Sequence, residues 1–436
     1  MRRSFDWPQI YGALVSQSSR SPKSAICAAR QIENDIFEEG WPAGEVFGDQ
    51  AHLIHRYGFS RATLREAARL LEDRHVAHMR RGPGGGLIIL PVSRAAVAAA
   101  VAHYFHSTGI SAAQIRKART ALRIAEAYRL ARAEGAEALH AFTKEFRGRL
   151  AEGSGIGLLD PDRWRFPHST RVAAGHIFTD LFSAFLDAIE DQTSAPNPPV
   201  ELRQGLAHAL ARKLMLELPR ARVEGAQRLG TEDQLCERHN VGREVLRQAV
   251  RLLESRGLID SQRGRTHGLH AGVSDTAALV ELVVAYLSSV RLTWSQLDPV
   301  AHVLSRIVRS VVTTESTPRQ RRELLARLES MGDRMDSPTL ITAQLHAEWS
   351  IVANPLLIFM ERCSAAYCAR SSAAIWKCFD DSELPPLAAL QRYMVASAHG
   401  DAVQVDRVVY GIYARVRALR NGGTISATLE THAVSA

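Results

Sequence analysis

The chain has 436 residues, of which 46% are hydrophobic and 23% charged, a balance typical of soluble globular proteins. We expect no signal peptide, and no apolar run approaches the roughly 18 residues that a membrane helix needs. Five cysteines in a chain of this length do not make a disulfide framework, which favours a reducing cytoplasm. The net charge of +8 weakly favours a polyanionic partner.

The first elements in chain order form a helix, a tight turn and a second helix. Glycine and proline in EEGWPAGEVFG (38–48) end an initial helix, and DQAHLIHRY (49–57) follows as a short one. Gly58 suits the left-handed conformation that ends a helix, and Ser60 suits the N-cap of the next. These signals predict a helix-turn-helix.

The helix over 60–75, SRATLREAARLLEDRH, has two distinct faces. Its buried face is predicted to comprise Leu64, Ala67, Ala68 and Leu71. Arg61, Arg65 and Arg69 form a stripe on the opposite face, and the guanidinium group suits phosphates and guanine edges. An alternative is an ordinary solvated face, with Arg69 paired to Glu72.

A basic, glycine-rich turn follows this helix. VAHM (76–79) and LIIL (87–90) are predicted to form two short strands around RRGPGGG (80–86). A hairpin of this kind describes the wing of a winged helix, with Arg81 and Gly82 near DNA, although a plain hairpin remains an alternative. The turn lacks the GK[ST] sequence of a nucleotide-binding loop.

The same pattern recurs later in the chain, at the fixed offset that maps Gly48 onto Gly230. Between Gly48 and Leu87, sixteen of forty residues are identical to those at the shifted positions, with no gap. GREVLRQAVRLLESRG (242–257) repeats the second helix, with Asn240 in place of the glycine. We interpret this match as an internal duplication of a large unit. The apolar face and the arginine stripe recur as Leu246, Ala249, Val250 and Leu253, and as Arg243, Arg247 and Arg251. The alternative of a solvated face recurs as well, with Arg251 paired to Glu254.

Each unit is followed by a helical segment, over 93–192 and 275–420. TSAPNPPV (193–200) is the clearest linker, and 421–436 is a polar tail.

Both units resemble the winged-helix domain of GntR-type bacterial repressors, particularly the FadR-like branch, which carries an all-helical ligand-binding domain. Copy two matches over EDQLCERHNVGREVLRQAVRLLESRGLIDSQRG. The family usually has an arginine early in the first of these helices, but positions 51 and 233 are Ala and Asp. One DNA contact that the resemblance implies is therefore missing from both copies. The DNA-binding residues that we predict are Ser60, Arg61, Thr63, Arg65, Arg69, Arg81, Gly82, Arg243, Glu244, Arg247, Arg251, Arg263, Gly264 and Arg265.

QLHAEWSIVANPLLI (344–358) resembles the effector-domain helix of the family, and 165–178 resembles a degenerate version. Many relatives hold a metal there through an Asp and three His, but only the histidine is kept, so we expect no metal and no cofactor. The pattern favours His168 and His346 as core or pocket histidines, and these two residues with Asn354 are the candidate effector contacts. Cys363, Cys368 and Cys378 match no zinc or redox spacing, and no catalytic constellation stands out.

The fold class predicted is mainly α, with two winged helix-turn-helix domains alternating with two all-helical domains, the first of them truncated. The expected boundaries are 1–23 for an extension, 24–92 and 196–273 for the winged helices, 93–195 and 274–420 for the helical domains, and 421–436 for the tail.

We therefore expect a cytoplasmic regulator, not an enzyme, that binds a double-stranded DNA operator as a covalent pseudo-dimer. A small-molecule effector (an organic acid or acyl thioester) and a homodimer are further expected partners, and no membrane is. A constitutive DNA-binding or architectural protein with eroded effector domains is the alternative. An enzyme or interaction protein with a retired DNA-binding unit is a more distant one.

Overall fold

In the computed structural model of this chain, two compact units are each assembled from separate stretches. The winged unit comprises 15–110 and 184–291, and the helical unit comprises 1–14, 111–183 and 292–436. The chain thus changes unit after residues 14, 110, 183 and 291. The changes after 110 and 291 come later than the expected boundaries after 92 and 273. The residues that the structure describes are 11, 24–73, 76–82, 84–152, 158–160, 164, 176–194, 206–207, 209–211, 213–214, 217, 228–255, 259–261, 269–271, 276–331, 345–371, 392–393, 395–397 and 399–420.

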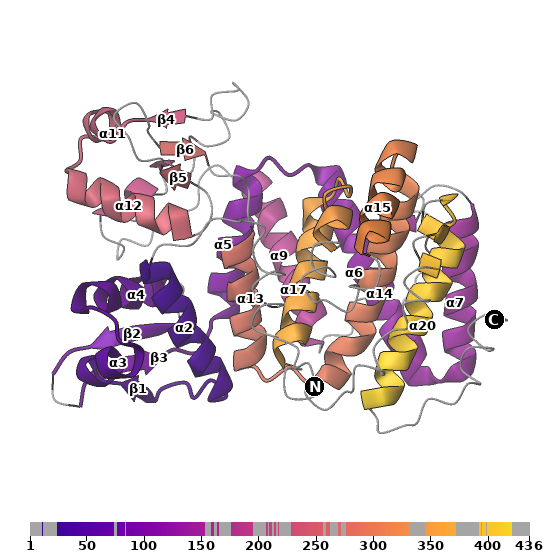
Figure 1. The fold of residues 1–436 in the computed structure, drawn as a ribbon, viewed down its shortest axis with the longest axis horizontal. Coiled ribbons are helices and arrows are strands. Elements are labelled where there is room, and N and C mark those ends of the chain that lie inside the picture. Colours follow the sequence, from indigo (N-terminus) through magenta and orange to yellow (C-terminus); the bar gives the residue numbers. More distant parts are fainter. Residues whose placement is uncertain are drawn as a thin grey trace. The chain divides into compact units, whose positions relative to one another are not determined.

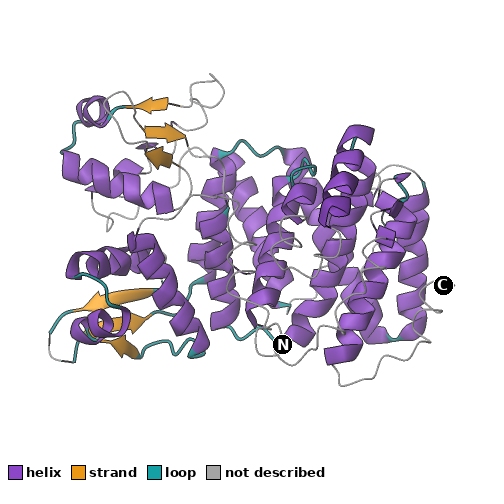
Figure 2. Ribbon diagram, in the orientation of Figure 1, coloured by secondary structure: helices purple, strands orange, loops and turns teal. Residues whose placement is uncertain are grey.

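The winged unit begins with three helices and a three-stranded antiparallel sheet (Figures 1 and 2). The strand order is β1-β3-β2, so the last strand lies in the middle. These elements are α2 (Ser24–Glu38), β1 (Val46–Gly48), α3 (Gln50–Tyr57), α4 (Arg61–Asp73), β2 (Ala77–Arg80) and β3 (Gly86–Ile89).

Local hydrogen bonds fix the turn between α3 and α4. Asp49 caps α3 by accepting from the His52 amide at 2.7 Å, and Gly58 ends the helix with φ 68°. Ser60 Oγ accepts from the Thr63 amide at 3.0 Å and so caps α4. The predicted helix-turn-helix is confirmed here.

The core of this winged helix forms where α2 and α4 pack together and α4 meets the sheet. The four apolar positions predicted on α4 are at most 5% exposed. Trp41, which lies between α2 and β1, donates its indole N–H to the Leu90 carbonyl at 3.0 Å and ties the loop to the end of the sheet.

A second set of elements follows at the constant offset that maps Gly48 onto Gly230. The bounds of α11, α12 and β4 equal those of α3, α4 and β1 shifted by this offset, and the sheet order β4-β6-β5 is the same. Asn240 ends α11 with φ 50°, as predicted. These elements are β4 (Arg228–Gly230), α11 (Glu232–His239), α12 (Arg243–Ser255), β5 (Ile259–Ser261) and β6 (Leu269–Ala271).

An ion pair is repeated at the same offset. Arg56 on α3 donates to Asp35 on α2 at 2.8 Å. Arg238 on α11 is 3.2 Å from Glu217. The acid changes from aspartate to glutamate, but the charge and position are retained.

The strands β1 and β4 were not predicted. In the sequence, 38–48 shows only the signals that end a helix, and the three residues Val46–Gly48 carry no alternation signal. They form a strand because β3 supplies the hydrogen-bonding partner, with a register shift between Val46 and Gly48. β4 has the same shift against β6.

Helices α5 (Arg94–Ser107) and α13 (Ala277–Ser289) complete the winged unit and pack against each other. Both helices follow the last strand of a sheet, and their positions again differ by close to the same offset.

The helical unit is organised around α14 (Trp294–Glu315), which packs against α6, α17 and α20. Every residue of α14 from Leu297 to Thr313 is buried, as expected for a central helix. Further helices of this unit are α6 (Ala112–Glu134), α7 (Ala136–Ala151), α15 (Pro318–Met331), α17 (Pro355–Ser371) and α20 (Ala402–Arg420). The first residues of α9 (Ile177–Ser194) belong to the helical unit and the rest to the winged unit.

The helices α6 and α14 begin with equivalent capping motifs. Ser111 and Gln114 form a capping box at the start of α6, and Thr293 and Gln296 form one at the start of α14.

Within the described part of the chain, no helix is both long and apolar enough to cross a bilayer.

Candidate nucleic-acid interface

The arginine stripe of α4 is exposed. Arg61, Arg65 and Arg69 lie about one turn apart and are all exposed, whereas Leu64 and Leu71 are buried. Among the described residues, none of the three has an acidic partner, and the predicted alternative pair of Arg69 with Glu72 is not formed there. The stripe therefore offers three guanidinium groups to a partner.

The stripe of α12 has the same spacing but a different charge environment. Arg243 Nη2 lies 2.8 Å from Asp233 Oδ1, and Arg247 Nε lies 3.4 Å from Glu232 Oε2. Arg251 Nε lies 3.0 Å from Glu66 Oε1 of α4. Each arginine of this stripe is thus ion-paired. The sequence suggests only Glu254, as an alternative partner for Arg251, so these three pairs are a finding of the structure.

The second helix of each helix-turn-helix, α4 or α12, is called here the reading helix. The other predicted contacts at the start of the reading helix differ between the copies. Ser60 and Thr63 bond to each other through their hydroxyl groups at 2.9 Å. Gly242 has no side chain for such a bond, and Glu244 is exposed. Beside the arginine that begins both helices, the start of α4 thus carries hydroxyl groups, whereas the start of α12 carries a carboxylate.

The wing of the first copy is a hairpin closed by backbone and arginine contacts. Gly85 N–H donates to the Gly82 carbonyl at 2.9 Å, and Arg80 Nη2 donates to the Gly84 carbonyl at 2.7 Å. Gly82 and Gly84 have φ values of 99° and 68°, which favour glycine. Arg81 is exposed at the start of this turn. The predicted Arg263, Gly264 and Arg265 of the second wing lie outside the described residues.

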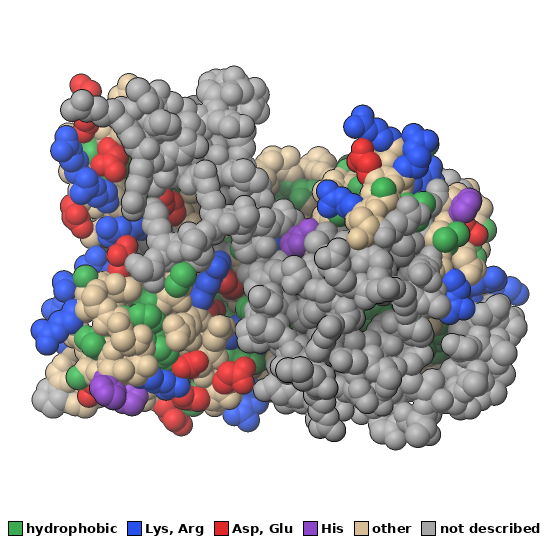
Figure 3. Space-filling view, in the orientation of Figure 1, with side chains coloured by type: hydrophobic (Ala, Val, Ile, Leu, Met, Phe, Trp, Pro, Cys, Tyr) green, Lys and Arg blue, Asp and Glu red, His purple; other side chains and the backbone are tan. Residues whose placement is uncertain are grey.

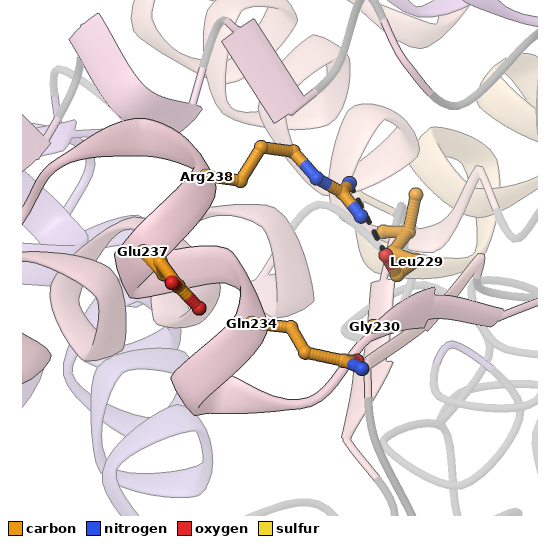
Figure 4. A pocket seen from close by; sticks show the side chains of 5 residues that line it. All are labelled: Leu229, Gly230, Gln234, Glu237 and Arg238. Atoms are coloured by element: carbon orange, nitrogen blue, oxygen red, sulfur yellow. Dashed lines mark hydrogen bonds between the residues drawn. The ribbon is translucent and has the colours of Figure 1, made fainter.

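An open pocket of about 490 Å³ lies on the second winged helix, between β4 and α11 (Figure 4). Arg238 donates to the Leu229 carbonyl across it at 3.4 Å. Its other lining residues are Gly230, Gln234 and Glu237. Gln234 Oε1 accepts from the Thr231 amide as part of a helix cap, so its carbonyl oxygen already has a structural partner.

The helical unit has a charged core that was also not predicted. Arg306 is fully buried and donates to Asp406 through Nε at 2.6 Å and Nη2 at 3.1 Å. Arg147 donates to the same carboxylate at 3.0 Å. Charged residues in an otherwise apolar α14 are the signal that points to such a network.

A second buried carboxylate, that of Asp298 on α14, is shared in the same way. Asp298 accepts from Arg132 at 2.5 Å and from Arg417 at 2.9 Å. His302 lies beside it, with Nδ1 at 2.9 Å from the Tyr128 hydroxyl. Burial, reinforced by nearby arginines, lowers the pKa of His302 well below its ordinary value, so this ring is neutral.

The predicted effector residues occupy separate positions. Asn354 caps α17 by accepting from the Leu356 amide at 3.1 Å, and its Nδ2 donates to the Gln114 carbonyl at 2.9 Å. The ring of His346 stands edge-on against Trp349. These contacts show structural roles, and binding of an effector stays a prediction. His168 lies outside the described residues.

The described residues contain no group of three or more histidine, cysteine or carboxylate side chains that could hold a metal. Cys363 is buried and unpaired, and burial raises its pKa well above the ordinary value, which keeps the thiol protonated. Cys378 lies outside the described part.

Comparison with known proteins gives matches at the level of structure. No family model matches the chain, and no curated protein matches it. A solved structure of Streptococcus agalactiae GntR is 17% identical, with a TM-score of 0.34, and the match covers 49% of this chain and 99% of that one. A structure of E. coli McbR/YncC is 14% identical, with a TM-score of 0.25, and covers 50% of this chain and 98% of that one.

Proposed function

We propose that this protein is a sequence-specific regulator of transcription that binds double-stranded DNA, and not an enzyme. The observation that carries the proposal is the exposed arginine stripe of α4 at the end of a helix-turn-helix with an adjoining basic hairpin. A helix of this width fits the major groove, where arginine can reach guanine edges and phosphates. Arg81 is exposed on the hairpin, and we propose that it contacts the phosphate backbone beside the groove.

The chain supplies two such readers, and we propose that it arose by tandem duplication and works as a covalent pseudo-dimer. The constant offset between the two sets of elements supports this proposal, as do the left-handed turns that recur at that offset. The ion pair Arg56–Asp35 also recurs, as Arg238–Glu217. Equivalent helices also pack together, α5 on α13 and α6 on α14, as in a two-fold dimer.

The two half-sites of the operator are proposed to differ. Ser60, Ala62 and Thr63 at the start of α4 correspond to Gly242, Glu244 and Val245 at the start of α12. Because these positions face base edges in a helix-turn-helix, different side chains select different bases. An imperfect palindrome follows, and half-sites of equal sequence and equal binding energy would contradict it.

Repression is the proposed outcome of DNA binding, with control by an organic acid or acyl thioester bound in the helical unit. Such an effector acts only if it binds one arrangement of the readers better than another. The alternative is a constitutive DNA-binding protein. Thermal unfolding with candidate acids distinguishes them, since an effector that binds the native state raises the Tm in a concentration-dependent way.

The test of DNA binding is fluorescence anisotropy with a duplex taken from upstream of the gene, in a salt series. Arg61→Ala/Arg65→Ala is expected to weaken binding at least tenfold and to reduce the salt dependence, because each lost phosphate contact removes about 0.9 from the slope. Arg319→Ala/Arg322→Ala on α15 removes the same charge and is the control. Equal binding by all three proteins would contradict the proposal.

A further inference from the structure

The two reading helices carry the same arginines, but the neighbouring positions differ in charge. Glu232 and Asp233 occupy the first turn of α11, where α3 has Gln50 and Ala51. A third acid, Glu244, follows Arg243, where α4 has Ala62. Three acidic groups on the second reading surface thus replace three neutral side chains on the first.

The acids of α11 lie against the arginines. The Arg243–Asp233 distance is 2.8 Å and the Arg247–Glu232 distance is 3.4 Å. All four side chains keep about half or more of their surface exposed, so the pairs form on the face that solvent, or DNA, reaches. In Figure 3, acidic and basic side chains alternate along the outer edge of the part that carries α11 and α12.

Glu66, in contrast, does not neutralise α4. Its carboxylate lies 3.0 Å from Arg251 of α12, and the described residues give Arg61 and Arg65 no acidic partner. Asp49, the acid that precedes α3, is turned to the helix itself, where it accepts from the His52 amide.

From this difference we infer that the two readers bind DNA unequally: α4 is the strong reader, and Glu232 and Asp233 weaken α12. The inference rests on the proposed DNA binding. A phosphate or guanine that approaches Arg243 or Arg247 must displace a carboxylate that already satisfies the guanidinium group. The same carboxylates repel the phosphate backbone where the first helix of a helix-turn-helix crosses it.

Surface ion pairs contribute little to stability, so these acids are not needed for folding. Replacing these acids by neutral residues therefore changes the charge of the reading surface without unfolding the protein. Glu232→Gln/Asp233→Ala gives the second reader the residues of the first, and Gln50→Glu/Ala51→Asp makes the reverse exchange.

The decisive assay uses full-length protein in which the first reader is disabled by Arg61→Ala/Arg65→Ala. Adding Glu232→Gln/Asp233→Ala is expected to strengthen binding to the upstream duplex at least tenfold. The salt slope is expected to steepen by nearly two, because two released arginines reach phosphates at about 0.9 each. A gain of affinity cannot result from misfolding. Glu315→Gln/Glu323→Gln in the helical unit makes the same change in net charge and is the control.

Two further variants compare the two readers in a chain whose first reader keeps its arginines. In the otherwise native chain, Gln50→Glu/Ala51→Asp is expected to weaken binding tenfold or more, and Arg243→Ala/Arg247→Ala by less than threefold. Unchanged binding after the gain exchange, or equal losses from the two arginine pairs, overturns the inequality while DNA binding stands. Failure of the native chain to bind any duplex at low salt rejects the proposed function, and the inequality with it.

Discussion

Gly109 and Arg291 occupy equivalent positions in the two copies, and both have a left-handed backbone, with φ 72° and 52°. Each is at the point where the chain leaves the winged unit, just before a capping box begins a helix of the helical unit. A turn that requires this conformation therefore recurs even where the residue is no longer glycine.

Substitutions at these two positions are expected to change the free energy of unfolding in opposite directions. Gly109→Ala places a Cβ in a left-handed conformation and is expected to lower the free energy of unfolding by about 1 kcal/mol. Arg291→Gly relieves the same strain, and because the side chain is exposed, we expect a gain of up to about 1 kcal/mol. Urea unfolding of both variants checks this, and a loss of stability in Arg291→Gly would contradict it.

The carboxylate of Asp406 holds two buried guanidinium groups, those of Arg306 and Arg147. Asp406→Asn keeps the shape but removes the charge that compensates both, so we expect a loss of about 3–5 kcal/mol. The matched control is Glu323→Gln, which breaks the exposed Arg319–Glu323 pair of 2.9 Å. Thermal or urea unfolding should show little change in the control; similar effects of the two substitutions would count against a stabilising core network.

The sequence predicted the elements whose signals are local. The turn at Gly58 and Asn240, the cap at Ser60 and the buried face of α4 depend on residues within a few positions of each other. The strands β1 and β4 were missed because three residues become a strand only through pairing with a partner about forty residues away.

The charged contacts were missed for a related reason. Arg306 and Asp406 are 100 residues apart, and Arg243 and Asp233 belong to different helices, so no periodicity connects them. The stripe of arginines was predicted for both copies, but only the folded chain places Glu232 and Asp233 against one of them. Composition gives the number of charges, and the fold decides which of them neutralise each other.

His302 predicts how stability depends on pH. Its pKa is lowered by burial first, and then by Arg306, Arg417 and Arg132, with Asp298 as the nearby acid. The folded protein therefore resists protonation of this ring, whereas the unfolded chain takes up a proton below its ordinary value of about 6.5. The free energy of unfolding should thus be unaffected by this group above that pH and fall below it.

The slope that one histidine contributes is at most about 1.4 kcal/mol per pH unit. We expect His302→Gln to lose less stability than the native chain between pH 7.5 and 5.5, measured by urea unfolding. Part of the slope should remain, because burial lowers the pKa of His176 in the same direction. Identical slopes for the two proteins would show that His302 does not act in this way.

Gly86 lies where the wing meets β1, with φ 156°. A Cβ at this position would lie 2.6 Å from the Gly48 carbonyl oxygen and 2.7 Å from a Val46 methyl group, closer than packed atoms allow. Gly86→Ala must therefore displace β1 or the hairpin, and a loss of about 1–3 kcal/mol is expected. Gly148→Ala on α7 meets nothing within 4 Å and is the control. Equal stability of the two variants would mean that β1 is not held against the wing.

Arg81 is exposed at the start of the first hairpin turn, while the neighbouring Arg80 is held by the Gly84 carbonyl at 2.7 Å. In the proposed complex Arg81 contacts a phosphate, and a phosphate contact carries no base preference. Arg81→Ala should therefore weaken specific and nonspecific duplexes by a similar factor and reduce the salt slope by about one. Anisotropy titrations with both duplexes measure this. A loss confined to the specific duplex would instead assign Arg81 to base recognition, and no loss would remove the wing from the interface.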